Sequence, residues 1–199
     1  MSGTLVTLLL VIAVLGVLWI MTYNRLVALK NRAANAFSQI DVQLKRRHDL
    51  IPNLVETARA YMAHERSTLE AVTGARNVAQ TAASAAVQNP ADAQALSAMA
   101  EAESALSSTL GRFFAVAEAY PDLKANRTMM QLAEEIATTE NKVAFARQAF
   151  NDAVMGLNTA IQSFPAVLFA RTLGFVAAPQ LQPIEAEAER QAPVVRFER

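Results

Sequence analysis

The chain has 199 residues, which is enough for one domain of ordinary size and a short additional segment. Its 18 basic residues balance 18 acidic ones, so the overall charge points to neither a nucleic-acid partner nor an acidic substrate. The lack of cysteine excludes disulfides, thiolate nucleophiles and thiolate metal ligands.

Composition also favours helices over strands. Hydrophobic residues make up 53% of the chain, with only 6 glycines and 7 prolines. The many alanines, leucines and glutamines are good helix formers, and few β-branched runs compete with them. We therefore expect an all-α protein.

A transmembrane helix is the first predicted element. Residues 5–21 form an apolar run broken only by Thr7 and Gly16, and no charged residue occurs before Arg25. A helix over residues 4–23 would be about 30 Å long, which matches the hydrocarbon core of a bilayer. Trp19 and Tyr23 stand at one end of the run, where aromatic side chains prefer the headgroup level. We predict an uncleaved membrane anchor over residues 1–23.

Two other interpretations of this run fit the sequence less well. A cleaved signal peptide would carry a basic residue before the run and small residues after it, whereas this run ends in Trp-Ile-Met-Thr-Tyr. A core helix of a small soluble domain would normally keep one polar face toward water, and this run is apolar on all sides.

The charges that follow the run predict its orientation. Arg25, Lys30 and Arg32 follow the span and no side-chain cation precedes it, so the positive-inside rule places the rest of the chain in the cytoplasm. Six basic residues and one acid occur from residue 25 to residue 47. This stretch could be attracted to anionic lipid headgroups, could form a solvated basic helix face, or both.

A long first helix of the soluble region is predicted from the span to residue 86. Pro52 falls within its pattern, and because the periodicity continues through it we expect a kink or a brief interruption there. Asn89-Pro90 ends the helix. Apolar or small residues recur at steps of three, four or seven and mark one face: Leu26, Leu29, Ala33, Phe37, Ile40, Leu44, Ile51, Leu54, Ala58, Met62, Leu69 and Val72.

A second helix is predicted over about residues 91–119, with Pro90 as its start signal. Its seam, the line of residues expected to face the other helices, reads Leu96, Met99, Glu103, Leu106, Leu110, Phe113, Ala117 and Tyr120. A third helix should run from the N-cap Asn126 to about residue 163. Its seam reads Met129, Ala133, Ile136, Glu140, Val143, Arg147, Phe150, Val154, Leu157 and Ile161.

The C-terminal part completes the predicted organisation. A short fourth helix should reach Leu173 ahead of Gly174, followed by an extended or flexible tail over residues 175–199. Long helices joined by short turns bury their seams by packing antiparallel. We predict a transmembrane helix that continues into an antiparallel bundle of three long helices and one short helix, with residues 24–174 forming the cytoplasmic bundle.

The sequence contains none of the motifs that would indicate an enzyme of a common class. There is no Gly-rich phosphate loop, no acid-rich calcium loop and no hydrolase-type serine elbow. His48 and His64 are sixteen residues apart, about 24 Å on one helix, so they cannot share a metal. We expect them to be single exposed histidines, and we predict no catalytic, cofactor-binding or metal-ligating residue and no cofactor.

Charged residues on the predicted seams are the remaining candidates for a site. One interpretation makes them a proton relay or a ligand site, and the other makes them interhelical ion pairs that fix the register of the bundle. The second is favoured because no nucleophile or cofactor motif accompanies them. These residues are Arg47, Glu65, Arg76, Glu103, Glu140 and Arg147, and the same reasoning predicts that Asn151 and Asn158 bridge helices.

Several ordered stretches resemble the LemA family of bacterial membrane-anchored proteins. They are YNRLV at 23–27, IDVQLKRRHDLIPNLV at 40–55, EAYPDLKAN at 118–126, TENKVAFAR at 139–147, Phe150-Asn151, Asn158 and Phe164-Pro165. The resemblance implies a four-helix bundle behind an N-terminal anchor, with a short outside N-terminus and the bundle in the cytoplasm. It also implies links to envelope maintenance, to a membrane zinc metalloprotease and, in one branch, to magnetosome formation. Phe150 and Leu157 depart from the family pattern, where tyrosines are common, and the family supplies no catalytic residues.

We therefore expect a non-catalytic scaffold at the bacterial inner membrane that self-associates, docks partner proteins, or does both. The alternatives are an adaptor or sensor that regulates a membrane protease or a signalling protein, and an unrecognised enzyme. Expected partners are membrane lipid, other copies of the chain and a membrane protein such as the metalloprotease, but no nucleic acid.

Self-association is expected to involve the membrane-proximal end of the first helix. A helix reaching residue 86 would be too long for its neighbours to cover, which would leave a bare stripe that includes Leu29, Ala33 and Phe37. We expect a closed homo-oligomeric ring formed through this stripe. The alternatives are that the stripe lies on the bilayer or is covered by the later helices of the same chain.

Overall fold

The structure is a computed structural model that describes residues 2–181. The helices are α1 (Ser2–Arg59), α2 (Arg66–Gln88), α3 (Ala93–Ala117), the short α4 (Pro121–Lys124), α5 (Arg127–Gln162) and a single 3-10 turn, η1 (Ala166–Leu168). The described residues contain no strand, which confirms the all-α prediction. Of the predicted tail, residues 182–199 lie outside the described part of the chain.

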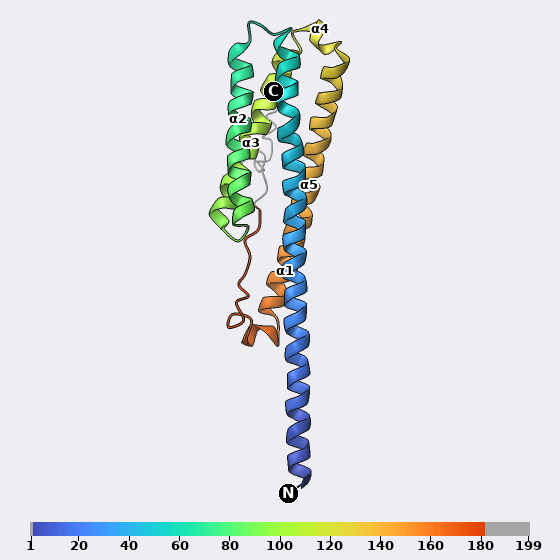
Figure 1. Ribbon diagram of the computed structural model, residues 1–199, viewed down its shortest axis with the longest axis vertical. Helices are drawn as coiled ribbons and strands as arrows, with labels where there is room; N and C mark the ends of the chain where they lie inside the picture. Colours follow the sequence, from blue (N-terminus) through green and yellow to red (C-terminus); the bar gives the residue numbers. More distant parts are fainter. Residues whose placement is uncertain (1, 182–199) are drawn as a thin grey trace, which may run out of the picture.

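Four long helices form an antiparallel bundle (Figure 1). α1 packs mainly against α5 and also against α2, and α2 packs against α3. The N-terminal part of α1 projects beyond the bundle, as Figure 1 shows. The predicted class, an N-terminal apolar helix that continues into an antiparallel helical bundle, is confirmed.

The predicted first helix is in fact two helices. α1 ends at Arg59, residues 60–65 reverse the chain, and α2 runs back along α1 to Gln88. The turn is closed by backbone hydrogen bonds, such as those from the Tyr61 and Met62 amides to the Ala58 carbonyl. The fourth bundle helix is therefore α2, not the predicted C-terminal helix, of which only η1 is present.

Pro52 does not interrupt α1, which is helical from Ser2 to Arg59. The expected interruption at this residue is therefore absent. The chain instead turns eight to thirteen residues later, where the sequence has neither glycine nor proline.

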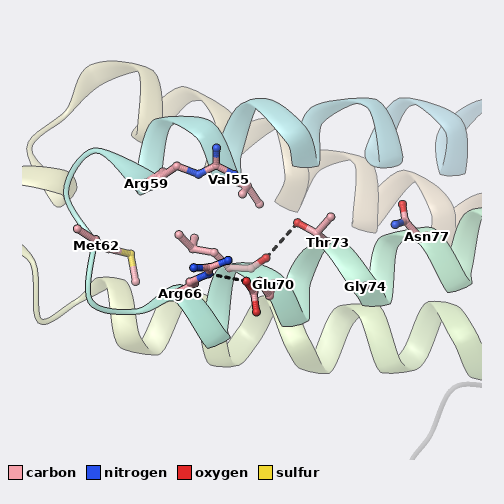
Figure 2. Close-up of a pocket in the computed structure, with 10 residues that line it drawn as sticks. Val55, Arg59, Met62, Arg66, Glu70, Thr73, Gly74 and Asn77 are labelled. Atoms are coloured by element: carbon pink, nitrogen blue, oxygen red, sulfur yellow. Dashed lines mark hydrogen bonds and ion pairs between the residues drawn. The ribbon is translucent and has the colours of Figure 1, made fainter.

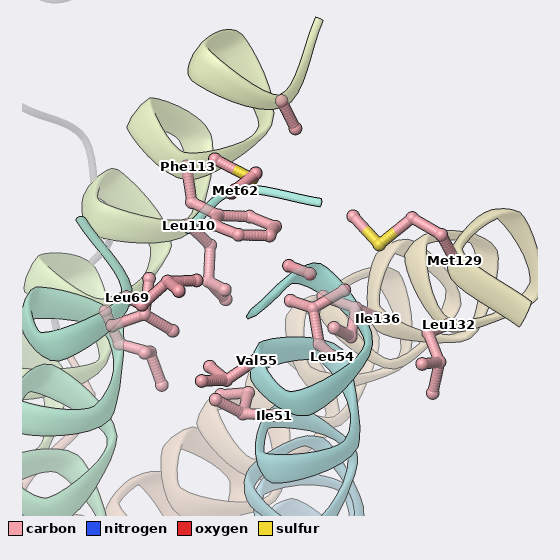
Figure 3. Close-up of a cluster of buried hydrophobic side chains, with 14 of the residues drawn as sticks. Ile51, Leu54, Val55, Met62, Leu69, Leu110, Phe113, Met129, Leu132 and Ile136 are labelled. Carbon is pink, nitrogen blue, oxygen red and sulfur yellow. The ribbon is translucent and has the colours of Figure 1, made fainter. Parts of the chain in front are cut away.

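The core consists of three clusters along the bundle axis. The cluster farthest from the N-terminus includes Leu54, Met62, Leu69, Phe113 and Ile136 (Figure 3). Met62 belongs to the turn after α1, and its side chain packs into this cluster. The middle cluster joins residues 33–44 of α1 to α2, α3 and α5. The third cluster surrounds Leu26 near the point where α1 leaves the bundle.

The stripe expected to be bare at the membrane-proximal end is covered by the same chain. Leu26, Ala33 and Phe37 are buried, and Leu29 is half-buried. Phe37 packs edge-on against Phe150 of α5, and Leu26 packs against Ala166 and its neighbours. The predicted interface for a ring is therefore wrong, and the alternative that the chain covers its own stripe is correct.

The projecting part of α1 has the properties of a membrane span. Among the described residues, α1 is the one helix long and apolar enough to cross a membrane, and its most apolar window is not buried by the rest of the protein. Its large apolar side chains from Leu5 to Met21 are exposed. A single N-terminal apolar helix of this kind is consistent with membrane anchoring.

Candidate functional site

A layer of polar side chains crosses the bundle between its distal and middle apolar clusters. It contains Arg47 and His48 of α1, Arg76 of α2, Glu103 and Ser107 of α3, and Glu140 and Arg147 of α5. We call this set the polar layer. Each of the four long helices contributes to it.

Glu103 lies at the centre of the polar layer and is buried together with its two partners. Its Oε1 is 2.7 Å from Nε2 of His48, and its Oε2 is 3.5 Å from Nη1 of Arg47. A buried carboxylate without partners would be strongly destabilising, and here a guanidinium and an imidazole offset its loss of hydration. The arrangement joins α1 to α3 at one defined register.

Ser107 and Glu140 extend the polar layer toward the surface. The Ser107 hydroxyl accepts a hydrogen bond from Nη2 of Arg47 at 2.7 Å and donates one to Oε1 of Glu140 at 2.9 Å. Glu140 Oε1 is also 3.7 Å from Nη2 of Arg47, and the Glu140 side chain is 52% exposed. Glu140 therefore makes an interhelical ion pair at the edge of the core, as predicted, while the neighbouring Thr139 is fully buried.

Arg147 stands beside the same network. Desolvation lowers the pKa of its guanidinium, and the nearby charge of Glu103 opposes this shift. Arg147, Glu140 and Ser107 line a cavity of about 460 Å³ that also reaches Asn151 and Leu181. Within the polar layer, the Nε atom of Arg47 is buried and has no hydrogen-bond partner among the described residues.

The remaining contact of the polar layer involves a backbone carbonyl. Pro52 has no N–H, so it cannot make the helical hydrogen bond to the carbonyl of residue 48. In this structure Nε of Arg76, from the neighbouring helix, donates to the His48 carbonyl at 2.9 Å. Arg76 thus replaces the missing helical donor and explains how α1 passes through Pro52 unbroken.

The serine and the histidine of the polar layer have different hydrogen-bond partners. The Ser107 hydroxyl bonds to Arg47 and Glu140, while the His48 imidazole bonds to Glu103. The Ser107 hydroxyl is thus hydrogen-bonded to a carboxylate and not to the imidazole, so the polar layer contains no serine–histidine pair. Among residues 2–181 no group of three His, Asp or Glu side chains is placed to hold a metal.

One of the two histidines differs from expectation. His48 is buried and paired, although the sequence predicts an exposed residue, whereas His64 lies exposed in the turn after α1. His48 could have been found from its spacing, since it lies four residues after Leu44 and three before Ile51. Ser107 could have been found in the same way, four residues after Glu103 on the same helix.

The remaining predicted seam residues make hydrogen bonds away from the polar layer. Glu65, in the α1–α2 turn, accepts a hydrogen bond from the Tyr120 hydroxyl at 3.2 Å. Burial raises the pKa of Tyr120, and the negative charge of Glu65 adds to the shift.

Asn126 caps α5 as predicted, accepting from the Met129 amide at 3.0 Å. Its amide nitrogen also donates to the Tyr61 hydroxyl, which ties the turn to the start of α5.

Asn151 and Asn158 do not bridge two helices but hold the extended chain after η1. The Asn158 side chain donates to the carbonyl of Ala178 and accepts from its amide, at 2.9 and 2.8 Å. Asn151 makes the same pair of hydrogen bonds with Leu181, at 2.8 and 2.9 Å. Residues 175–181, predicted to be part of an extended or flexible tail, are thus extended and attached to α5.

A second cavity, of about 740 Å³, lies at the end of the bundle farthest from the N-terminus. Figure 2 shows it between the end of α1, with Val55 and Arg59, and the first turns of α2, with Arg66 and Glu70. Nε of Arg66 is 2.7 Å from Oε1 of Glu70, and both side chains are exposed. We call this cavity the distal groove.

Comparison with known proteins identifies a matching family and several relatives. The LemA family matches residues 36–197 of the chain. The magnetosome protein MamQ of Magnetospirillum gryphiswaldense is 26% identical over 171 residues, which cover 78% of this chain and 63% of that protein. Magnetosome protein MamQ 2 of Paramagnetospirillum magneticum is 25% identical over 194 residues, covering 87% of this chain and 71% of that protein. The chain therefore spans less than two thirds of the Magnetospirillum gryphiswaldense protein.

Proposed function

Because the chain belongs to the LemA family, we propose that it is a non-catalytic scaffold, anchored in the bacterial inner membrane, that self-associates or docks partner proteins through its bundle. The anchor would be the projecting part of α1, with the bundle in the cytoplasm. The relatives that carry the name magnetosome protein are only 25–26% identical, so that role is not proposed for this chain.

The observation that carries this proposal is the continuity of α1. One helix runs from the apolar span to the distal turn. From Tyr23 to Arg59 it extends for about 55 Å at the helical rise of 1.5 Å per residue. With the span in a bilayer, the bundle would hold the distal groove at a fixed distance from the membrane, as a scaffold requires.

The polar layer supports a structural role rather than a chemical one. Its charged groups pair with one another across α1, α3 and α5, and buried pairs of this kind specify register. A rigid bundle with a single register suits the presentation of a binding surface.

The distal groove favours the second candidate function, an adaptor that regulates a membrane protease or a signalling protein. It is the larger of the two cavities described above, and its rim carries Arg59, Arg66 and Glu70. A protein partner of mixed charge would fit such a rim.

Isolation of the full chain from native membranes in mild detergent separates the two candidates. The scaffold is supported by a homogeneous oligomer whose size is unchanged in the Arg66→Glu/Glu70→Arg variant, which swaps the groove charges but keeps the ion pair. The adaptor is supported by a monomer with one stoichiometric partner that this variant releases. A monomer with no partner in native membranes would contradict both.

A further inference from the structure

The segment that follows α5, residues 163–176, has an apolar face turned toward α1. Ala166, Ala170 and Phe175 are buried in a cluster around Leu26. Figure 1 shows this segment beside α1 at the level where α1 leaves the bundle. We call residues 163–176 the base segment.

The base segment also has an apolar face that the bundle leaves uncovered. Phe164 is 79% exposed and Leu168 is 70% exposed, and Val167 and Val176 are exposed as well. These side chains are not needed for the core, because the alanines and Phe175 already fill the contact with Leu26. These four large exposed side chains, here called the apolar patch, fall within thirteen residues, a density of exposed apolar groups that soluble surfaces rarely carry without a partner.

Two aromatic contacts fix the height of the base segment against the span. Phe169 stacks on Trp19 with ring centroids 4.3 Å apart, and Phe175 meets Tyr23 edge-on at 5.8 Å. Trp19 lies within the apolar run, and Tyr23 is the aromatic residue that closes it. The base segment therefore lies level with the end of the span, where aromatic side chains prefer the membrane interface.

Part of the backbone of the base segment is hydrogen-bonded within the segment itself, which lowers the cost of an environment poor in water. The amides of residues 167–170 and 173–175 all donate to carbonyls within residues 163–171. Close to a bilayer an unpaired amide is costly, so a segment that lies there must pair its own backbone.

The charged residues on the base segment and on the segments next to it are all basic. Arg25, Lys30, Arg32 and Arg171 are exposed, and neither residues 2–40 nor residues 153–181 contain an acid. Cations at this height would lie against anionic lipid headgroups.

From these observations we infer that the base segment is a second membrane contact, which binds the membrane interface without crossing it. We call this contact the foot. In it, Phe164, Val167 and Leu168 enter the headgroup region beside the span. This inference rests on the proposed anchoring by α1. Anchor and foot together would fix the tilt of the bundle, which a single helix leaves to its surroundings.

Single cysteines in this cysteine-free chain, each carrying an environment-sensitive fluorophore, test the inference in the full-length protein. Leu168→Cys reports on the foot. Phe145→Cys is the matched control, because Phe145 is also a highly exposed apolar residue, at 72%. It lies on α5 about 25 Å before the C-terminal end of that helix at the helical rise, and so away from the base segment. Leu10→Cys reports on the span. The proteins are placed in vesicles of phosphatidylcholine and phosphatidylglycerol, with spin-labelled lipid or with iodide on both sides as quencher.

We expect the probe at residue 168 to be quenched several-fold more by spin-labelled lipid than the probe at 145, and to be shielded from iodide. Equal access of iodide to 168 and 145, with residue 10 quenched by lipid, would overturn the foot and leave the anchor. Shielding of 168 without lipid quenching would show that a protein surface, such as a second copy, covers the apolar patch, which also overturns the foot. A residue 10 probe that lipid does not quench would overturn the anchor and the foot together.

Discussion

At the scale of single residues, the fold depends on how polar groups inside the bundle find partners. Pro52 removes a helical donor in the middle of α1, and Nε of Arg76 supplies another at 2.9 Å. A buried carbonyl without a donor costs about 1–3 kcal/mol. The proline is therefore tolerated because of a residue that lies 24 positions later on a different helix.

This compensation predicts a coupling between the two residues. Arg76→Ala should lower the free energy of unfolding by about 1–3 kcal/mol, because it leaves the His48 carbonyl without a donor. In a Pro52→Ala background the same change should cost much less, because residue 52 then donates to that carbonyl. Denaturant unfolding of the four proteins in detergent measures the coupling, with Arg46→Ala, which breaks only an exposed ion pair, as the control. Equal costs of Arg76→Ala in both backgrounds would refute the compensation.

The carboxylates of the polar layer should differ sharply in importance. Glu103→Ala should lower stability by about 3–5 kcal/mol, because it leaves the buried Arg47 and His48 without their shared acceptor. Glu140→Ala should cost no more than about 1 kcal/mol, since Glu140 is half-exposed and Arg47 keeps Glu103. Thermal or denaturant unfolding of the two variants makes the comparison. If neither change affects stability but cellular function is lost, the layer is a ligand site rather than a structural one.

At the scale of elements, two asparagines attach an extended segment to a helix by matching their spacings. Asn151 and Asn158 are seven residues apart, about 10.5 Å along a helix. Ala178 and Leu181 are three residues apart, about 9–10 Å along an extended chain. The pairing of 158 with 178 and of 151 with 181 is antiparallel, as it must be once the chain has reversed at the base segment.

This match predicts which amides each asparagine protects. Asn151→Ala should speed hydrogen exchange at the Leu181 amide by roughly tenfold, the effect of losing a hydrogen bond worth about 1.4 kcal/mol. Asn158→Ala should act first on the Ala178 amide. Residue-resolved exchange measures both, and Asn141→Ala, at an exposed position of the same helix, should change neither. Unchanged exchange in both variants would show that the asparagines do not hold the segment.

At the scale of the whole molecule, α1 has two environments along one uninterrupted helix. Its first part is apolar and uncovered, and its second part is buried on one face by α2 and α5. The cations Arg25, Lys30 and Arg32 lie where the two parts meet. The sign of charge at this junction is expected to set the orientation of the chain in the membrane.

A reporter fused after Arg199 tests this orientation. Alkaline phosphatase should be inactive there, and a fluorescent protein that matures only in the cytoplasm should be bright. Changing Arg25, Lys30 and Arg32 to glutamine, together with Ser2→Lys and Gly3→Lys, should raise phosphatase activity because the charge bias is reversed. Full phosphatase activity in the unaltered chain would place the bundle, and every proposed partner, on the other side of the membrane.

The sequence by itself determined the features that depend on local periodicity and local chemistry. The apolar run at residues 5–21, the α3 seam from Leu96 to Ala117 and the Asn126 cap all appear in the structure as expected. Each depends on residues within a few turns of one another. That Glu103 forms an interhelical ion pair was also predicted, although not with which residues, because a charge on a buried seam must have a partner.

Only the tertiary structure decided where the chain reverses and which partner each polar group finds. The seam spacing runs through residues 58–72 without a break, because Met62 stays buried while the backbone turns around it. The spacing of apolar residues in the sequence therefore does not reveal the turn. The buried state of His48, the donor for its carbonyl and the attachment of Leu181 each join residues at least 28 positions apart. Periodicity shows which face of a helix must be covered, but only the packed bundle determines what covers it.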